Sequence, residues 1–224
     1  MSESNLELKS RKIETRNPCA ITCVVFGIDE IRENFELSMQ TIDSNLLEGA
    51  NLEKEGKIKL AEDLYRFLIA SLESAFDYFI HCILKLGFQE MYLQEREGSD
   101  RYNKFCIPMS VVTELLNNSD DPNPLLVFID ERFCADTYLG YEKFKDAFSF
   151  INKNIVSEVS TELYDGDQAK LKDFIERIYK RRNLIVHQDD RISLTGEKSK
   201  ISSEDVKDFK NELEKIVFKI ISKF

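Results

Sequence analysis

Apolar side chains recur every three or four residues along most of the chain, the period of an α-helix with one buried face. The first such stretch predicts a helix that begins at Asn17 and Pro18, the N-cap and the first helical residue. Gly49 is the predicted C-terminal cap of this helix, and Gly27 is an interior glycine tolerated at a modest cost. The apolar positions of this helix are Ile21, Val24, Val25, Ile28, Ile31, Phe35, Met39, Ile42 and Leu46.

The second stretch, from about residue 57 to about residue 92, has the widest apolar face in the chain. A helix with such a face is surrounded by others, so we expect this one to be central. Its predicted apolar positions are Leu60, Leu64, Phe67, Leu68, Leu72, Ala75, Phe76, Phe79, Ile80, Ile83 and Leu84. A narrow polar face is left to Ser74, Asp77, His81 and Lys85.

The middle of the chain alternates polar connections with short apolar runs. Residues 94–108 predict a connection, 110–116 a short helix, and 117–124 a turn cluster rich in Asn, Asp and Pro. The apolar run 125–129 suits a strand or a helical turn equally well. Apolar residues at helical spacing then predict one helix over 141–159.

Two helices complete the predicted fold. Residues 165–167 (Asp-Gly-Asp) break the chain, and a helix with apolar positions from Leu171 onward leads into a basic segment. Residues 188–201 predict a loop, and Ser202 or Ser203 caps the closing helix. The prediction is therefore all-α, a bundle of four or five long helices plus short helices.

The 224 residues are enough for one domain of generous size. No repeat, low-complexity tract or linker divides them, so we expect a flexible N-terminal arm over 1–16 and a single helical domain over 17–224. The polar first seventeen residues predict no secretory signal, and no apolar run approaches the length of a membrane span. We therefore expect a cytoplasmic protein with no membrane partner.

The chain carries 31 cationic and 41 anionic side chains, a formal charge of −10. This balance argues against broad, non-specific coating of nucleic acid. Residues 170–182 nevertheless carry a local charge of +4, from six cations and two anions. Cations also collect at the C-terminal ends of helices because the helix dipole favours them, and the charge pattern alone fits both interpretations.

The cysteines number five, an odd count without a C-x-x-C pair, and most lie in apolar helical context. This pattern predicts reduced, buried thiols rather than disulfides. No metal-ligand spacing or glycine-rich phosphate loop is present, so we expect neither a metal nor a cofactor. The five are Cys19, Cys23, Cys82, Cys106 and Cys134.

Candidate chemistry gathers in one segment, residues 180–190, which contains Arg182, Asn183 and one of two histidines in the chain, His187. Arginine is the natural clamp for a phosphate, and histidine transfers protons near neutral pH. Together they suffice to cleave RNA without a metal, through attack of the ribose 2′-OH on its own phosphate. The same residues also fit a plain, solvated helix end.

This reaction needs both an acid and a base, whereas one chain supplies a single good candidate, His187. A symmetric homodimer with the segment near its axis would bring two histidines and two arginines into one cleft. The mechanism therefore predicts a homodimer.

The segment 182–187 resembles the R-x4-6-H motif of the HEPN superfamily of helical nucleases, in which a polar residue, often Asn, follows the Arg. The wider setting resembles the RiboL-PSP HEPN branch, with a helix ending like RRN-x-I-x-H, acidic residues, a polar loop and a final helix. Residues 71–84 also resemble the central helix of that branch. The resemblance covers roughly residues 20–224.

The resemblance implies a HEPN-type helical bundle, a dimer and a metal-independent endoribonuclease, typical of bacterial antiphage defence or toxin–antitoxin systems with a partner protein. By matching position, Arg182 would bind or polarise the scissile phosphate, His187 would be the acid/base, and Asn183 would orient the substrate or His187. HEPN toxins paired with a nucleotidyltransferase antitoxin often carry Tyr two residues after the His. Asp occupies position 189 here, so control by modification of that Tyr is not supported.

Other residues admit two interpretations each. Lys180 and Arg181 would contact RNA phosphates away from the cut, or would be solvated. His81 follows Asp77 by four residues, and a local Asp–His pair is favoured over a role in the cleft. Two other functions also remain open: a catalytically inactive HEPN module that binds RNA or protein, and a helical interaction protein with no nucleic-acid role.

Overall fold

The computed structural model describes residues 23–192 and 195–224, and these residues form nine α-helices and no β-strand. The all-α prediction is confirmed. The predicted arm and the start of the predicted first helix lie outside the described residues. In chain order the helices are α1 (Ile28–Lys54), α2 (Ile58–Tyr92), α3 (Asp100–Asn103), α4 (Met109–Asn117), α5 (Asn123–Phe133), α6 (Tyr141–Ser149), α7 (Ile155–Tyr164), α8 (Gln168–Gln188) and α9 (Ser203–Ile221).

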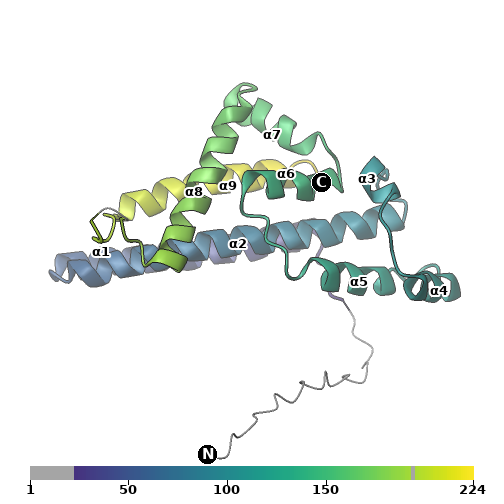
Figure 1. Ribbon diagram of the computed structural model, residues 1–224, viewed down its shortest axis with the longest axis horizontal. Coiled ribbons are helices and arrows are strands. Elements are labelled where there is room, and N and C mark those ends of the chain that lie inside the picture. Colours follow the sequence, from purple (N-terminus) through teal and green to yellow (C-terminus); the bar gives the residue numbers. More distant parts are fainter. Residues whose placement is uncertain (1–22, 193–194) are drawn as a thin grey trace, which may run out of the picture.

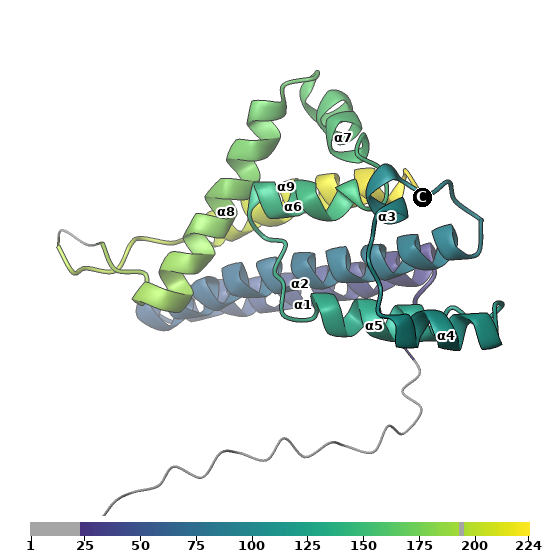
Figure 2. The same cartoon turned by 45° about the vertical axis from the view of Figure 1, so that its right-hand side comes forward.

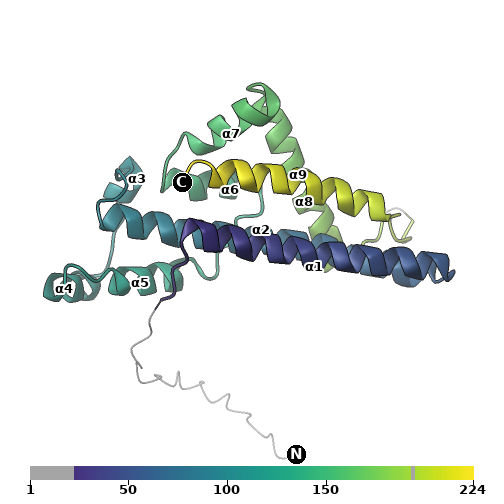
Figure 3. The same cartoon turned by 180° about the vertical axis from the view of Figure 1, so that it is seen from behind.

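The four long helices make the frame of the fold. Helices α1 and α2 run side by side along its length, and α6, α8 and α9 all lie on one side of this pair (Figures 1 and 3). Helix α9 packs on both α1 and α2. Helix α8 crosses the bundle steeply, and the C-terminal end of α8 contacts α2 (Figure 2). The central place predicted for the second helix is confirmed, since α2 contacts α1, α5, α6, α8 and α9.

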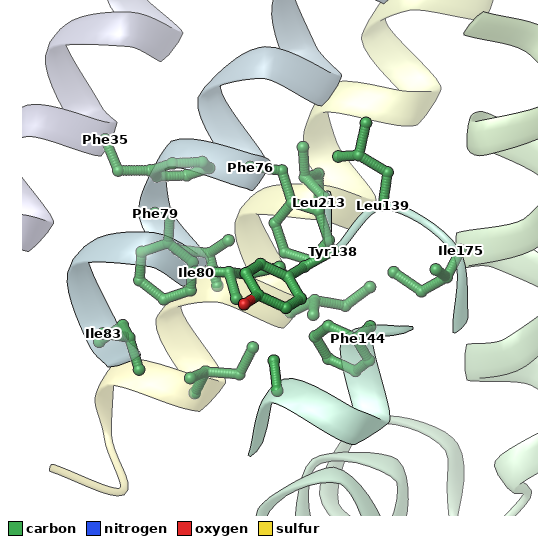
Figure 4. Close-up of a cluster of buried hydrophobic side chains, with 14 of the residues drawn as sticks. Phe35, Phe76, Phe79, Ile80, Ile83, Tyr138, Leu139, Phe144, Ile175 and Leu213 are labelled. Atoms are coloured by element: carbon green, nitrogen blue, oxygen red, sulfur yellow. The ribbon is translucent and has the colours of Figure 1, made fainter. Parts of the chain in front are cut away.

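The core gathers around the middle of α2. Phe76, Phe79 and Ile80 of α2 point toward Tyr138 and Phe144, which come from the segment before α6 and from α6 itself (Figure 4). Ile175 of α8 and Leu213 of α9 complete the cluster. Each large apolar side chain buried here contributes about 1.5–3 kcal/mol, so this cluster fixes how α8 approaches α2.

The prediction for the first helix is wrong at both ends within the described residues. Helix α1 begins at Ile28 because Gly27 has an extended backbone, and its N–H donates to Glu30 Oε2 at 2.9 Å. Gly49 does not end α1, which continues to Lys54. A Cβ atom on Gly49 would lie 2.3 Å from Cε1 of the buried Tyr65, so this glycine lets α1 and α2 approach closely.

Two further boundaries differ from prediction. The predicted helix over 141–159 is two helices, α6 and α7, because Asn152 Oδ1 accepts from the N–H of Asn154 at 2.9 Å and forms a local turn. The run 125–129, left open between strand and helix, belongs to α5, which begins inside the predicted turn cluster.

Other predicted signals are confirmed. The break at 165–167 separates α7 from α8, with Asp165 and Gly166 both in the left-handed region at φ 54° and 85°. Ser202 caps α9, and the N3 residue Asp205 completes a capping box. Helix α2, contrary to the prediction from apolar runs, is long and apolar enough to span a membrane. However, 56% of that stretch is buried inside the bundle, which a core helix of a soluble protein would also show.

Candidate functional site

The candidate segment occupies the last turns of α8, as predicted. Asp167 caps the start of α8 by accepting from the N–H of Ala169 at 3.1 Å. The helix ends at Gln188, and Asp189 and Asp190 follow in the left-handed region at φ 51° and 56°. These two residues turn the chain sharply at the end of α8, two residues after His187.

The turn is held by a buried ionic group that we call the Asp190 cluster: Asp190, Arg66 and Arg181. The Asp190 carboxylate has no exposed surface and accepts from Arg66 Nε at 2.8 Å. Arg181 binds both carboxylate oxygens, with Nη1 at 2.5 Å and Nη2 at 2.9 Å. Because Arg66 lies on α2, the cluster attaches the end of α8 to the central helix.

The two arginines of the cluster also hold the chain beyond the turn. Arg66 Nη2 donates to the carbonyl oxygen of Ser199 at 2.8 Å, and Arg181 Nη2 donates to that of Lys200 at 3.2 Å. The residues between form an isolated bridge, Arg191 to Lys198. The predicted loop 188–201 is therefore tied to both α2 and α8.

Of the predicted catalytic residues, the structure brings Arg182 and Asn183 into direct contact. Arg182 Nη1 donates to Asn183 Oδ1 at 3.0 Å, and both side chains are half-buried. His187 lies one turn further on the same side of α8 as Asn183 and is exposed. Arg182 and His187 are five residues apart on α8, about 140° around the helix axis, so they project from different sides of the same helix end.

The two predicted RNA-contacting residues lie in different settings. Lys180 is exposed, as a phosphate contact requires. The guanidinium of Arg181 is engaged by Asp190, and its side chain is 18% exposed. A contact between Arg181 and RNA would compete with the ion pair between Arg181 and Asp190. A contact between Lys180 and RNA would not disturb that ion pair.

One acidic residue near Arg182 was not assigned from the sequence. Glu73 on α2 is fully buried, and neither of its carboxyl oxygens has a hydrogen-bond partner among the residues that the structure describes. Burial raises the pKa of Glu73 to about 8, Arg182 is the neighbouring cation that opposes this rise, and Asp77 adds to it. At pH 7 Glu73 is therefore mostly protonated and leaves the positive charge of Arg182 uncompensated.

A signal for Glu73 was present in the sequence. It stands between Ile69 and Phe76 on the α2 face that carries Ile80, so the helical period alone places a carboxyl among core positions. A charged residue on an apolar face is rarely buried without a partner, which makes it a candidate for function.

His81 and Asp77 take a structural role, and their predicted local pairing is replaced by contacts to another segment. His81 Nε2 lies 3.3 Å from the carbonyl oxygen of Asp136, and its ring packs 5.0 Å from that of Tyr138. Asp77 Oδ1 accepts from the N–H of Tyr138 at 2.8 Å. Both residues fix the segment that leads from α5 to α6.

The cysteine prediction is correct only in part. The four described cysteines are free thiols, but only Cys82 is buried, while Cys106 and Cys134 are exposed and Cys23 is half-buried. Cys19 lies outside the described residues. Within residues 23–192 and 195–224, no three His, Cys, Asp or Glu side chains are arranged to hold a metal ion.

Comparison with known proteins returned no match to a protein-family model, and no significant match to a curated protein or to a solved structure.

Proposed function

We propose that this protein is a metal-independent endoribonuclease of the HEPN type, which acts in the cytoplasm as a homodimer. The observation that supports the proposal is the arrangement at the end of α8. The Arg182 side chain donates a hydrogen bond to the Asn183 side chain, and the exposed His187 lies one turn beyond Asn183. The resemblance of this segment to the HEPN motif supplies the reaction type and the setting, bacterial antiphage defence or a toxin–antitoxin system with a partner protein.

In the proposed reaction a ribose 2′-oxygen forms a bond to the adjacent phosphorus, and the bond from phosphorus to the 5′-oxygen breaks. One His187 removes the 2′-OH proton, and the His187 of the second copy protonates the leaving 5′-oxygen. Arg182 stabilises the charge that builds on the phosphoryl oxygens. The products are a 2′,3′-cyclic phosphate and a free 5′-OH, with no metal or cofactor consumed.

Two neighbouring features suit these roles. The protonated state of Glu73 near pH 7 leaves the full charge of Arg182 for a phosphate. The Asp190 cluster attaches the C-terminal end of α8, which carries Arg182 and His187, to α2. A preorganised arginine lowers the reorganisation needed at the transition state.

The test is RNA cleavage in EDTA by wild type, Arg182→Ala and His187→Ala, with analysis of the product ends. Arg32→Ala is the matched control, because Arg32 is an exposed arginine on α1. We expect wild type and control to leave 2′,3′-cyclic phosphate ends, and each site variant to lose at least about a hundredfold in rate. Equal cleavage by all four proteins would refute the assignment.

The same preparation tests the alternative of a catalytically inactive RNA-binding module. Salt-sensitive RNA binding that weakens in Lys180→Ala, without cleavage by any variant, would favour that alternative. Absence of both binding and cleavage would favour a helical interaction protein.

A further inference from the structure

A pocket of about 530 Å³ lies where α7, α8 and α9 meet. The three helices form the sides of a triangle, since α7 contacts both α8 and α9, and the rings of Phe174 on α8 and Phe209 on α9 lie 6.1 Å apart (Figures 1 and 3). The volume is within the range of sites that hold a small organic molecule. We call this site the Arg177 pocket, after the arginine of α8 that lines it.

Arg177 supplies a flat cationic surface to the pocket. Its guanidinium carbon lies 5.3 Å from the ring centroid of Phe209, and its side chain donates no hydrogen bond to any residue that the structure describes. Glu212, which also lines the pocket, is engaged elsewhere, because it accepts from the Tyr164 hydroxyl at 2.5 Å and from Lys215 Nζ at 2.9 Å. A guanidinium packed on a ring offers unused donors and a flat plane, and nucleobases stack on such planes.

Two carboxylates, Asp173 of α8 and Asp208 of α9, also line the pocket. Both are exposed, and neither side chain has a hydrogen bond or an ion pair within the described ranges. They would repel a bare phosphate, and Arg177 and Lys170 would repel a bare cation. A planar group with amino donors on its edge suits the whole lining, because a carboxylate only accepts hydrogen bonds and the arginine offers a plane for stacking. A nucleobase with an exocyclic amino group has this chemistry, whereas uracil turns two carbonyl oxygens toward the same edge.

An exposed face of α8 leads from the pocket to the candidate site. Four side chains follow one another along this face at intervals of seven, three and seven residues, which places them on one side of the helix. They are Lys170, Arg177, Lys180 and His187. Neither lysine forms an ion pair with another described residue, so both are available to phosphates. From Arg177 to His187 the helix rises about 15 Å, a distance that a few nucleotides of single-stranded RNA can span.

We propose that the Arg177 pocket holds a nucleobase with an exocyclic amino group, which belongs to a single-stranded RNA cut a few nucleotides away at His187. The inference rests on the proposed function, which supplies RNA as the ligand. The base stacks on Arg177 and its amino group donates to Asp173 or Asp208, while Lys180 contacts the phosphates between the pocket and His187. A base within a duplex is stacked and paired and cannot enter, so the pocket selects an unpaired strand as well as a base.

The experiment compares two strands with the same sugar and phosphate backbone, oligocytidylate and oligouridylate. Cytosine carries an amino group where uracil carries a carbonyl oxygen. Fluorescence anisotropy on the full chain with His187→Ala measures binding without cleavage. We expect oligocytidylate to bind at least about tenfold more tightly, because the uracil oxygen would face carboxylates that cannot donate. Asp173→Asn combined with Asp208→Asn should abolish this preference, since an amide both donates and accepts.

Two further arms test the stacking surface and the source of the base. Arg177→Met should weaken binding of both strands by roughly fivefold or more, because the base loses the plane on which it stacks. Arg32→Met, the same change at an exposed arginine on α1, is the matched control and should bind as the parent protein does. Cytidine monophosphate carries the same base without a strand, and we expect it to compete only at concentrations about a hundredfold above those of oligocytidylate.

Each outcome decides the inference. Absence of RNA binding, equal binding of the two strands, or a preference that survives in the double Asp variant would overturn it. Cytidine monophosphate that competes as well as oligocytidylate would assign the pocket to a free nucleotide and overturn the role of the strand.

RNA cleavage is scored separately, with His187 intact. A uridine strand that contains a single cytidine should be cut at one fixed distance from that cytidine, and cuts spread evenly along the strand would overturn the inference. A preference for oligocytidylate in binding, without cleavage of any RNA, would leave the pocket standing and refute the nuclease. Cleavage by the wild type without any preference between the strands would do the reverse.

Discussion

Replacing Glu73 with Gln should remove a pH dependence from the stability of this protein. The Glu73 carboxyl is fully buried and has no hydrogen-bond partner in the described part of the chain, and its pKa rises from 4.5 to about 8 on folding. Between these two values the folded chain holds a proton on Glu73 that the unfolded chain has released. The free energy of unfolding therefore falls as pH rises through this window.

The size of this effect follows from linkage, at about 1.36 kcal/mol for each unit of pKa difference. At pH 5 the folded carboxyl is protonated while about three quarters of the unfolded one is already ionised, and at pH 8 the unfolded carboxyl is ionised while half of the folded one is not. From pH 5 to pH 8, wild type should lose about 3 kcal/mol of stability through Glu73 alone. Glu73→Gln cannot ionise and should not lose it.

The assay is urea unfolding of both proteins at several pH values between 5 and 8.5, followed by circular dichroism. The difference between their free energies of unfolding isolates Glu73, because all other titrating groups are shared. Glu33→Gln, a change at an exposed glutamate on α1, is the control and should track wild type. The reasoning would be wrong if the free energies of unfolding of Glu73→Gln and wild type changed with pH in parallel, within about 1 kcal/mol. That result would show that Glu73 is ionised in the folded protein.

Three further substitutions test other contacts described above. Arg182→Met removes the cation that holds down the pKa of Glu73, so the loss of stability should extend to higher pH, read from the same unfolding curves. Asp190→Asn keeps a residue that tolerates the left-handed backbone but removes a buried charge between two arginines, and should cost about 3 kcal/mol in urea unfolding. Gly49→Ala drives a methyl group into the ring of Tyr65 and should cost about 1–3 kcal/mol, despite the better helix propensity of Ala.

Matched controls accompany these variants. Asp189→Asn makes the same chemical change at another left-handed position, but its carboxylate is 58% exposed, so we expect a much smaller loss of stability than for Asp190→Asn. Gly27→Ala adds a methyl group whose nearest neighbour is Glu30 Oε2 at 3.7 Å, so no clash is expected. An Asp190 variant no less stable than its Asp189 control would argue against the cluster, and unaltered stability of Gly49→Ala would mean that the Tyr65 ring moves aside freely.

The helical period was enough to predict the all-α class, the extent of α2 and the place of the basic segment at the end of α8. These features depend on local spacing and capping, which the sequence carries directly. The break after α6 was missed because the side chain of Asn152 competes with the helix for backbone groups, which periodicity does not detect.

The candidate site was predictable only for residues on α8 itself. The spacing of Asn183 and His187 follows from one helix, but the contacts of Arg181 and the setting of Glu73 depend on how α8 meets α2. Asp190 follows the predicted end of α8 in the sequence, and only the approach of Arg66 from α2 shows that it anchors the turn. Sequence spacing carries no information about such a contact between distant segments.

The contact between Arg66 and Asp190 joins residues 124 positions apart, and this separation has a consequence for how the protein comes into being. Contacts between residues so far apart in the sequence form late and slowly, because the intervening chain must first be closed into a loop. During synthesis α2 emerges long before residue 190, so a nascent chain has the arginine without its carboxylate. The end of α8 therefore reaches its final geometry only after residue 190 has been made and has met α2, which would delay any activity at that end until then.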